Sequence, residues 1–309
     1  MVDLVCSVGL VLVLVVLGGA YAVRVATSGA ASFDRVKRDK GSALFGAGAM
    51  QMGYWGLDPI GRGLARAGVS ANFISTTSLV LGLGAAAGLA LGHFGVAAAL
   101  AVVSSVCDAL DGMVARQTRT ASDSGEVLDA TIDRYVEFTF LGGLAIYDHD
   151  RPLRLTIALA AILGSFMVSY ATAKGEAMGV EVPRGAMRRP ERAVYLTLGA
   201  ALCPFAALWA AHGGAAWMSE APMISATTLV AVIGNVSAVR RLRAVARALR
   251  GRDAQGARSA AKDTGSSGKA EERPAEAAPP TTALPSFGPS GPDASGENAT
   301  SEVRRAAHG

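Results

Sequence analysis

Long apolar segments of about 20 residues recur along the chain, and they limit its possible folds more than any other feature. A helix of about 20 residues spans the roughly 30 Å hydrocarbon core of a bilayer. We expect such helices at residues 4–23, 72–92, 95–116, 126–147, 153–178, 191–211 and 223–246. Hydrophobic residues make up 51% of the chain and charged residues only 17%, which is typical of helical membrane proteins. The sequence therefore predicts an all-α integral membrane protein with a core of six transmembrane helices and one extra transmembrane helix before it.

The segments between and after these spans divide the chain into parts. We expect an N-terminal membrane anchor at 1–24, a cytoplasmic linker at 25–53, a core at 54–249 and a disordered cytoplasmic tail at 250–309. Residues 54–66 mix arginines with aromatic residues and leucines, which indicates an amphipathic helix at the membrane surface. The tail is rich in Ser, Pro, Gly and mixed charge without hydrophobic periodicity, which is typical of disorder.

Most basic residues lie on one side of the predicted spans, and the opposite loops carry few, chiefly Arg151 and Arg154. The majority follow the first span from Arg24 onward and recur near 117–125, near 179–190 and after 247. Cytoplasmic loops carry this excess of Lys and Arg, so we expect an external N-terminus and a cytoplasmic core face, as in a bacterial inner-membrane protein. The net charge of +4 does not indicate nucleic-acid binding, because the basic residues lie in short loops. Residues 20–22 also resemble a signal-peptidase site, so a cleaved signal stays open beside the favoured anchor.

Four aspartates interrupt the apolar sequence between residues 108 and 133. Asp108 and Asp111 are three residues apart and Asp129 and Asp133 are four apart, so each pair shares one face of a helix. An ionised aspartate at the bilayer centre costs about 2.5 kcal/mol or more on insertion scales, and a bound divalent metal lowers that cost. The helix rise places both pairs at similar depth, below the cytoplasmic boundary. We therefore expect one polar pocket that opens to the cytoplasm.

The aspartates suit phosphoryl chemistry. Carboxylates from two helices can hold two Mg²⁺ or Mn²⁺ ions, which prefer oxygen ligands and stabilise the attacking and leaving oxygens of a phosphate. Arg116, two turns after Asp108, can pair with a phosphate, and Gly112 and Gly125 leave room for a ligand or a neighbouring helix. The residues alone predict a metal-dependent enzyme that acts on a phosphorylated, lipid-linked substrate.

An ion-coupled membrane transporter is the alternative class, because buried acidic residues also mark ion pathways. Transporters of this kind usually show internal repeats and helices broken near the midplane. The chain shows no convincing repeat, and its acidic residues lie toward one side of the membrane. We therefore favour the enzyme.

The aspartate region resembles the signature of the CDP-alcohol phosphotransferases, D-x2-D-G-x2-A-R-x8-G-x3-D-x3-D. The fixed positions are Asp108, Asp111, Gly112, Ala115, Arg116, Gly125, Asp129 and Asp133. Residues 71–75 also resemble the P-N-x-I-T stretch of that family, with Ala71 and Ser75 in place of Pro and Thr. The resemblance covers about residues 55–246, so the first span and the tail lie outside it.

The resemblance implies transfer of the phosphatidyl group of CDP-diacylglycerol to an alcohol, with release of CMP. It implies that Asp108, Asp111, Asp129 and Asp133 bind the metals and that Asp133 is also the general base on the acceptor hydroxyl. Binding of the CDP-lipid would fall to Asn72, Gly112, Ala115, Arg116, Ser122 and Gly125. Family members often form homodimers, which we expect here.

Two later segments resemble the phosphatidylinositol-phosphate synthase branch of that family. These are residues 169–176 and 188–192, and they imply acceptor binding by Ser169, Lys174, Arg188, Arg189 and Arg192. Together with Arg184 these basic residues suit an anionic acceptor such as inositol phosphate or, alternatively, glycerol 3-phosphate. The branch tends to carry a basic residue at Thr172 and Arg at Lys174, so another alcohol stays open.

Overall fold

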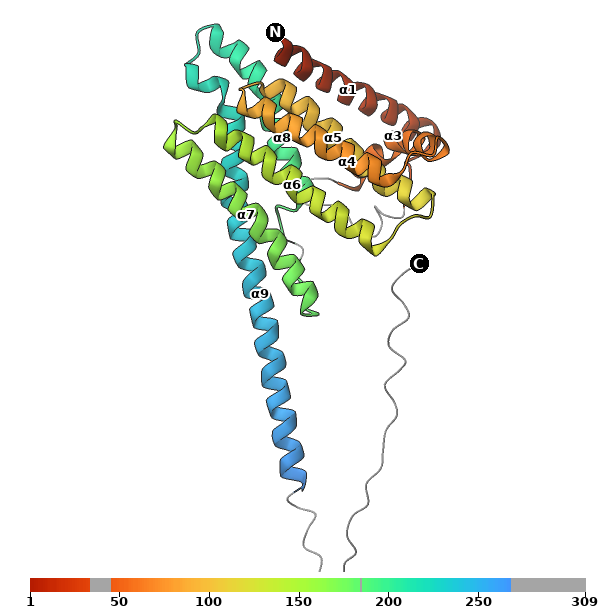
Figure 1. The fold of residues 1–309 in the computed structure, drawn as a ribbon, viewed down its shortest axis with the longest axis vertical. Helices are drawn as coiled ribbons and strands as arrows, with labels where there is room; N and C mark the ends of the chain where they lie inside the picture. Colours follow the sequence, from red (N-terminus) through yellow and green to blue (C-terminus); the bar gives the residue numbers. More distant parts are fainter. Residues whose placement is uncertain (34–45, 184, 268–309) are drawn as a thin grey trace, which may run out of the picture. The chain divides into compact units, whose positions relative to one another are not determined.

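The computed structural model describes residues 1–33, 46–183 and 185–267, and this part of the chain is helical without a strand. Figure 1 shows its elements. They are α1 (Val2–Ser28), α3 (Ala47–Arg66), α4 (Ala71–Ala90), α5 (Phe94–Gln117), α6 (Asp123–Tyr147), α7 (Pro152–Ala177), α8 (Arg189–Ala211), the 3-10 helix η1 (Ala216–Ser219) and α9 (Ala221–Ser267). The predicted all-α class is confirmed.

Six of the described helices are long and apolar enough to cross a membrane. They are α1, α4, α5, α7, α8 and the part of α9 that ends at Arg258. These helices confirm the prediction of an integral membrane protein. The remaining predicted span is α6, which is 25 residues long but carries charged side chains in its first half. At 1.5 Å per residue, α6 is long enough to cross the membrane. Because it is not one of the six apolar helices, its crossing of the membrane stays a prediction.

Two predicted boundaries were wrong. Helix α3 begins at Ala47, before the expected start at residue 54, and α9 continues to Ser267, well past the expected end at 246. The first part of the predicted disordered tail is therefore helical, because Ala and Arg, which favour helices, predominate between residues 244 and 258. Residues 34–45 of the predicted linker and 268–309 of the predicted tail lie outside the described residues.

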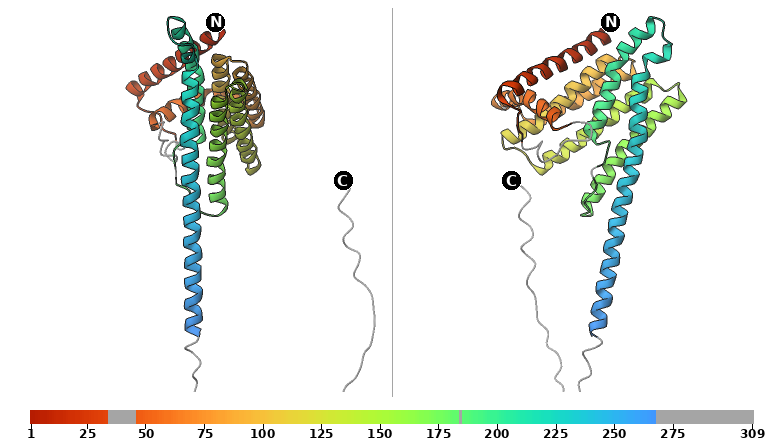
Figure 2. Two further views of the ribbon diagram at one scale, coloured as in Figure 1. Left: turned by 90° about the vertical axis from the view of Figure 1, so that its left-hand side faces the viewer. Right: turned by 180° about the vertical axis from the view of Figure 1, so that it is seen from behind.

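Residues Met1–Gln255 form one compact unit, and its helices pack through small residues. Figures 1 and 2 show α4 and α5 side by side, with α6 against α4 and α7 beside α6. A Cβ added to Gly143 of α6 would lie 2.2 Å from the carbonyl oxygen of Ala86, so only glycine permits this contact with α4. Close approach at small residues is the usual means of packing helices in a membrane. It holds α6, which carries two of the aspartates, firmly against the bundle.

Helix α1 contacts the other helices near both of its ends. The Asp3 carboxylate accepts hydrogen bonds from the backbone N–H groups of Gly95 (2.9 Å) and Val96 (3.2 Å), and so caps the first turn of α5. Near the other end, the Tyr21 ring lies 5.6 Å from the Trp55 ring of α3, centroid to centroid. The extra helix is therefore part of the compact unit.

Charged side chains at the carboxyl end of α6 and the amino ends of α7 and α9 form a closed network. Arg151 contacts Asp148 at 3.3 Å and Glu220 at 3.0 Å, and Arg154 also pairs with Glu220. The Tyr147 hydroxyl donates to Glu220 at 2.5 Å. We call these five residues the distal network. It joins the start of α9 to the α6–α7 turn.

Candidate active site

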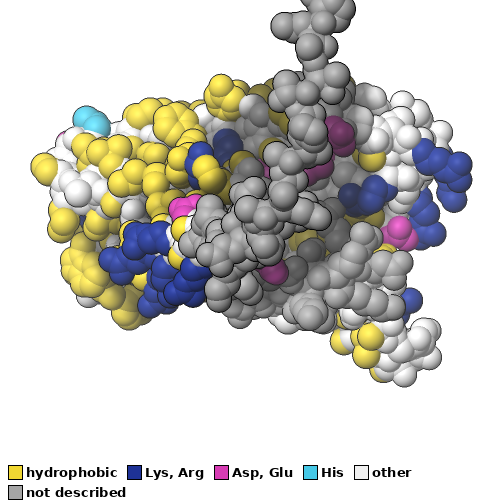
Figure 3. Space-filling view, turned by 90° about the horizontal axis from the view of Figure 1, so that it is seen from below, with side chains coloured by type: hydrophobic (Ala, Val, Ile, Leu, Met, Phe, Trp, Pro, Cys, Tyr) yellow, Lys and Arg dark blue, Asp and Glu magenta, His cyan; other side chains and the backbone are white. Residues whose placement is uncertain are grey.

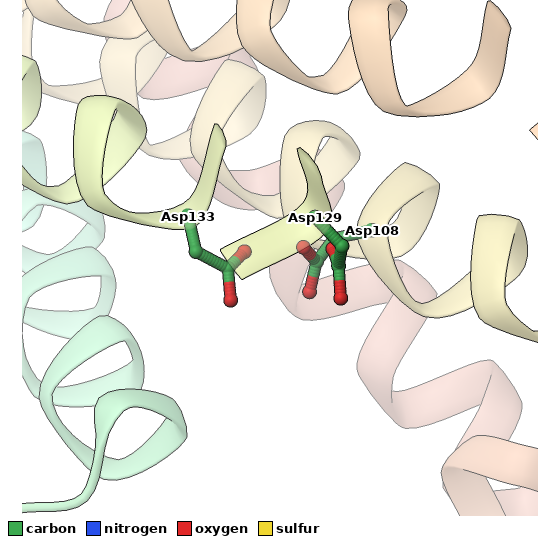
Figure 4. A group of neighbouring side chains, drawn as sticks. All are labelled: Asp108, Asp129 and Asp133. Atoms are coloured by element: carbon green, nitrogen blue, oxygen red, sulfur yellow. The ribbon is translucent and has the colours of Figure 1, made fainter. Parts of the chain in front are cut away.

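Helices α5 and α6 bring three of the four predicted aspartates together. One carboxylate oxygen from each of Asp108, Asp129 and Asp133 lies within 4.8 Å of those of the other two (Figure 4). Asp108 comes from α5, whereas Asp129 and Asp133 lie one turn apart on the same face of α6. All three side chains are half-buried, and we call them the acidic group. Three oxygen ligands from two helices fit a hard divalent cation such as Mg²⁺ or Mn²⁺.

The turn between α5 and α6 sets this arrangement. Arg119 has a φ of 57°, in the left-handed region, and reverses the chain after α5. Ser122 then caps α6, because its hydroxyl accepts the backbone N–H of Gly125 at 3.2 Å. Two residues predicted to bind the CDP-lipid, Ser122 and Gly125, therefore meet at the amino end of α6. Backbone N–H groups at such an end favour an anionic ligand.

The fourth aspartate lies outside the acidic group. Asp111 is only 5% exposed, and its Oδ2 accepts a hydrogen bond from the Ser75 hydroxyl at 2.5 Å. This hydrogen bond joins α5 to α4. Asp111 reaches α4 because its side chain, three residues after Asp108, points in a somewhat different direction around α5. The role of Asp111 as a metal ligand stays a prediction.

Arg189, the first residue of α8, faces the acidic group. Its Nη1 lies 3.1 Å from Asp108 Oδ2, and its Nη2 forms an ion pair with Asp133. Arg189 was predicted to bind the acceptor, and the structure places it directly beside the aspartates. With Arg116 and Arg134 also counted, the four aspartates of the signature are accompanied by three arginines. The site therefore has more acidic than basic side chains.

Of the other residues predicted to bind the CDP-lipid, Gly112, Ala115 and Arg116 follow Asp108 on α5, whereas Asn72 lies on α4. A Cβ added to Gly112 would lie 3.1 Å from Arg116 Nη1, so the Arg116 guanidinium folds back over Gly112. Ala115 is half-buried on α5, and Asn72 is exposed in the first turn of α4. Their contacts with a ligand stay predictions.

The residues predicted to bind the acceptor are not all in one place. The Ser169 hydroxyl donates to the Ser165 carbonyl at 3.1 Å, and Lys174 is exposed in the last turn of α7. Arg188 is the residue before α8 and is half-buried. Arg184 lies outside the described residues. Of this set, Arg189 is the one for which an ion pair with the acidic group is observed.

Arg192 differs from the prediction of an acceptor contact. It is 1% exposed, and its Nε and Nη2 bind the two carboxylate oxygens of Glu137 at 2.5 and 2.7 Å. Its Nη1 donates to the Met187 carbonyl at 2.6 Å. All three guanidinium nitrogens bind protein oxygens, so Arg192 supports the site by joining α8 to Glu137 of α6 and to the loop before α8. Sequence reasoning missed Glu137, although it lies one turn after Asp133, the spacing that places both on one face of α6.

A hollow of about 500 Å³, including space open to solvent, lies among α4, α5, α6 and α8. Glu137 and Arg189 supply charged groups to its wall, and Gly82, Ala85 and Leu196 are among its apolar lining. Because Arg189 also contacts Asp108 and Asp133, the hollow adjoins the acidic group. The site thus joins a charged, metal-compatible part to an apolar one.

Comparison with known proteins identifies a family that matches this chain. The model of the family described as CDP-alcohol phosphatidyltransferase matches residues 69–236. The phosphatidylinositol phosphate synthase of Corynebacterium glutamicum is 32% identical over 170 residues, which cover 51% of this chain and 78% of the relative. The archaetidylinositol phosphate synthase of Methanothermobacter thermautotrophicus is 32% identical over 143 residues, which cover 46% of this chain and 70% of the relative.

Solved structures show the same fold. The phosphatidylinositol phosphate synthase of Mycobacterium tuberculosis with CDP-DAG bound matches with a TM-score of 0.53 and 25% identity, over 61% of this chain and 92% of that chain. The same enzyme in complex with manganese and citrate matches with a TM-score of 0.53 and 27% identity, over 61% of this chain and 88% of that chain. Both matches leave part of this chain uncovered.

Proposed function

The chain belongs to the CDP-alcohol phosphatidyltransferase family, and we propose that inositol phosphate is the alcohol to which it transfers the phosphatidyl group. It is a divalent-metal-dependent transferase of phospholipid synthesis, and its lipid donor is CDP-diacylglycerol. Because the chain belongs to this family, we no longer consider the alternative that it is an ion-coupled membrane transporter.

One observation carries the choice of an anionic acceptor: the Arg189 guanidinium lies beside the aspartates at which the acceptor hydroxyl must react. A guanidinium binds a phosphate through paired, charge-assisted hydrogen bonds. An uncharged alcohol offers no anionic group that this guanidinium could bind. The curated relatives described above are synthases of inositol phosphate lipids, which supports inositol phosphate over glycerol 3-phosphate.

The donor would be held by residues of the signature. Arg116, folded over Gly112, would pair with the diphosphate, and the capped amino end of α6 at Ser122 and Gly125 would bind phosphate oxygens. Asn72 and Ala115 would complete the site for the CDP portion. Asp108, Asp129 and Asp133, with Asp111 behind them, would hold Mg²⁺ or Mn²⁺, which would withdraw charge from the phosphates and stabilise the developing oxyanions.

The chain's own residues would then perform the proton transfer. Arg189 exchanges its contacts with Asp108 and Asp133 for the acceptor phosphate, and this frees the Asp133 carboxylate. Asp133 takes the proton of the acceptor hydroxyl. The hydroxyl oxygen attacks the phosphorus attached to diacylglycerol, the bond from that phosphorus to the bridging oxygen breaks, and CMP leaves with the bonding electrons.

The proposal includes an orientation in the membrane. Basic side chains gather on the face seen in Figure 3, and the sequence places Lys and Arg after α1, after α5 and along the end of α9. This distribution supports an active site that faces the cytoplasm in a bacterial inner membrane. We also infer that α1 is retained, because both of its ends contact the bundle. The homodimer expected from the family resemblance is part of the same proposal.

The test uses the purified protein with CDP-diacylglycerol, Mn²⁺ and a panel of acceptors: inositol phosphate, glycerol 3-phosphate, inositol and serine. We expect CMP release with inositol phosphate and none after chelation of the metal. Arg189→Gln should raise the KM for inositol phosphate more than the KM for CDP-diacylglycerol, whereas Arg240→Gln, at an exposed position of α9, should change neither. CMP release with inositol but not with its phosphate would refute the proposed acceptor.

A further inference from the structure

The loop before α8 carries Arg188 and Arg189, and its backbone has an uncommon conformation. Met187 has a φ of 63°, in the left-handed region, and its side chain is only 2% exposed. A residue with a long side chain adopts this conformation only where the surrounding structure holds it there. The contacts that hold Met187 therefore also decide where the two arginines lie.

Helix α9 holds the loop from one side. The Ser237 hydroxyl donates to the Ala186 carbonyl at 2.8 Å. Arg241 Nη2 donates to the carbonyls of Gly185 and Ala186, at 3.2 and 3.3 Å. These bonds join two consecutive carbonyls of the loop to one face of α9, just before Met187.

Helix α8 holds the loop from the other side. Glu191 Oε2 accepts the backbone N–H groups of Met187 at 2.7 Å and Arg188 at 3.2 Å. Arg192 donates to the Met187 carbonyl while its other nitrogens bind Glu137. Each residue from Gly185 to Arg188 thus has a backbone group bound to a side chain from α8 or α9. A loop held this way keeps Arg189 in one position.

Arg241 is a buried cation whose hydrogen bonds all go to uncharged oxygens. It is 7% exposed, its Nη1 donates to the Thr172 hydroxyl at 2.9 Å, and its buried Nε has no partner. Within residues 1–33, 46–183 and 185–267, Arg241 forms no ion pair with a carboxylate. A buried cation without a directly paired carboxylate is costly; Glu191 is the acidic group that acts on Arg241, at longer range than an ion pair, and the bonds of Arg241 to the loop offset part of the cost.

We propose that Ser237 and Arg241 are positioning residues of the active site. They act through the loop and keep the Arg189 guanidinium against Asp108 and Asp133. In that position Arg189 competes with divalent ions for two carboxylates of the acidic group, and it is also ready to receive the phosphate of the acceptor. The second consequence rests on the proposed function, whereas the first rests only on metal binding by the acidic group.

The metal arm of the test measures Mn²⁺ affinity by titration calorimetry on the full-length protein in detergent. Arg241→Gln should tighten Mn²⁺ binding about fivefold, because the released Arg189 competes less well. Arg189→Gln should have the same effect, and the double variant should bind no more tightly than either single variant. Ser237→Ala should act in the same direction but more weakly. Arg240→Gln, the exposed neighbour on α9, should leave the affinity unchanged.

The acceptor arm measures steady-state kinetics. Arg241→Gln should raise the KM for inositol phosphate about tenfold while the KM for CDP-diacylglycerol stays within about twofold. Weaker Mn²⁺ binding in Arg241→Gln would overturn the positioning role, as would effects that add in the double variant, because a general brace damages every part of the site. Absence of turnover with inositol phosphate in the unmodified protein would refute the proposed acceptor and leave the metal arm to decide.

Discussion

The bundle has two clusters of acidic and basic side chains, and they differ in how their charges are balanced. In the distal network, Asp148 and Glu220 are matched by Arg151 and Arg154, and every one of these four groups takes part in an ion pair inside the cluster. At the active site, carboxylate oxygens of three aspartates, Asp108, Asp129 and Asp133, lie within 4.8 Å of one another, and Arg189 pairs with two of these aspartates.

This difference separates a structural cluster from a ligand site. In the distal network both buried carboxylates, Asp148 and Glu220, pair with arginines, so this cluster needs no added cation and joins helices. Crowded carboxylates in excess repel one another unless cations are added, so the acidic group is suited to divalent metal. Substitutions that remove the same charge from each cluster should therefore have different consequences.

Asp133→Asn should have the largest effect, a fall in kcat of about a thousandfold, because the variant lacks the general base. Mn²⁺ binding should largely survive through Asp108 and Asp129, as calorimetry would show. The matched change in the other cluster, Asp148→Asn, should leave kcat within about twofold. Full turnover by Asp133→Asn would exclude Asp133 as the base.

Glu220→Gln should lower stability and leave the chemistry intact. The variant loses a charge that pairs with two arginines, which we expect to cost about 1 to 2 kcal/mol, or roughly 5 °C in Tm. Thermal unfolding in detergent measures the shift, and CMP release at 25 °C serves as the control. A loss of kcat without a loss of Tm would show that the two clusters are coupled.

The contribution of Glu220 should depend on pH. Burial opposes its ionisation, but hydrogen bonds from Tyr147 and Arg154 and the charge of Arg151 outweigh burial and lower the pKa of Glu220 below its ordinary value of 4.5. A carboxyl whose folded pKa is depressed stabilises the fold above its unfolded pKa, and this stabilisation is lost as the pH falls through the folded value. The Tm difference from Glu220→Gln should therefore be constant between about pH 6 and 8 and shrink below about pH 4.5. A difference that grows on acidification would contradict this sign.

Asp3→Ala should have the smallest effect. It removes the cap of α5, which is worth about 1 kcal/mol, and so lowers Tm by about 3 °C. Asp58→Ala is the control, because it breaks a partly exposed ion pair with Arg62 on α3 and should change Tm much less. Equal Tm values for Asp3→Ala and the unmodified protein would indicate that α1 is a loosely attached anchor.

The helices of this protein were largely predictable from sequence, because apolar segments of membrane length have few alternatives. The span expected at 95–116 is α5 at Phe94–Gln117, for example. The extension of α9 was not predicted, because hydropathy reports only the membrane part of a helix. Contacts such as the one from Arg252 to the Met178 carbonyl, at 2.8 Å, join that extension to the end of α7.

The sequence by itself determined the chemistry, because helical spacing places Asp129 and Asp133 on one face and a short turn brings Asp108 beside them. Only the tertiary structure decided the surroundings. It placed Arg189 beside the aspartates, buried Arg192 against Glu137 and joined Arg241 to the loop before α8. Eight basic residues between 174 and 243 look alike in sequence, because charge alone does not show whether a basic side chain meets a carboxylate, a carbonyl or water. That is decided by which helix packs against it.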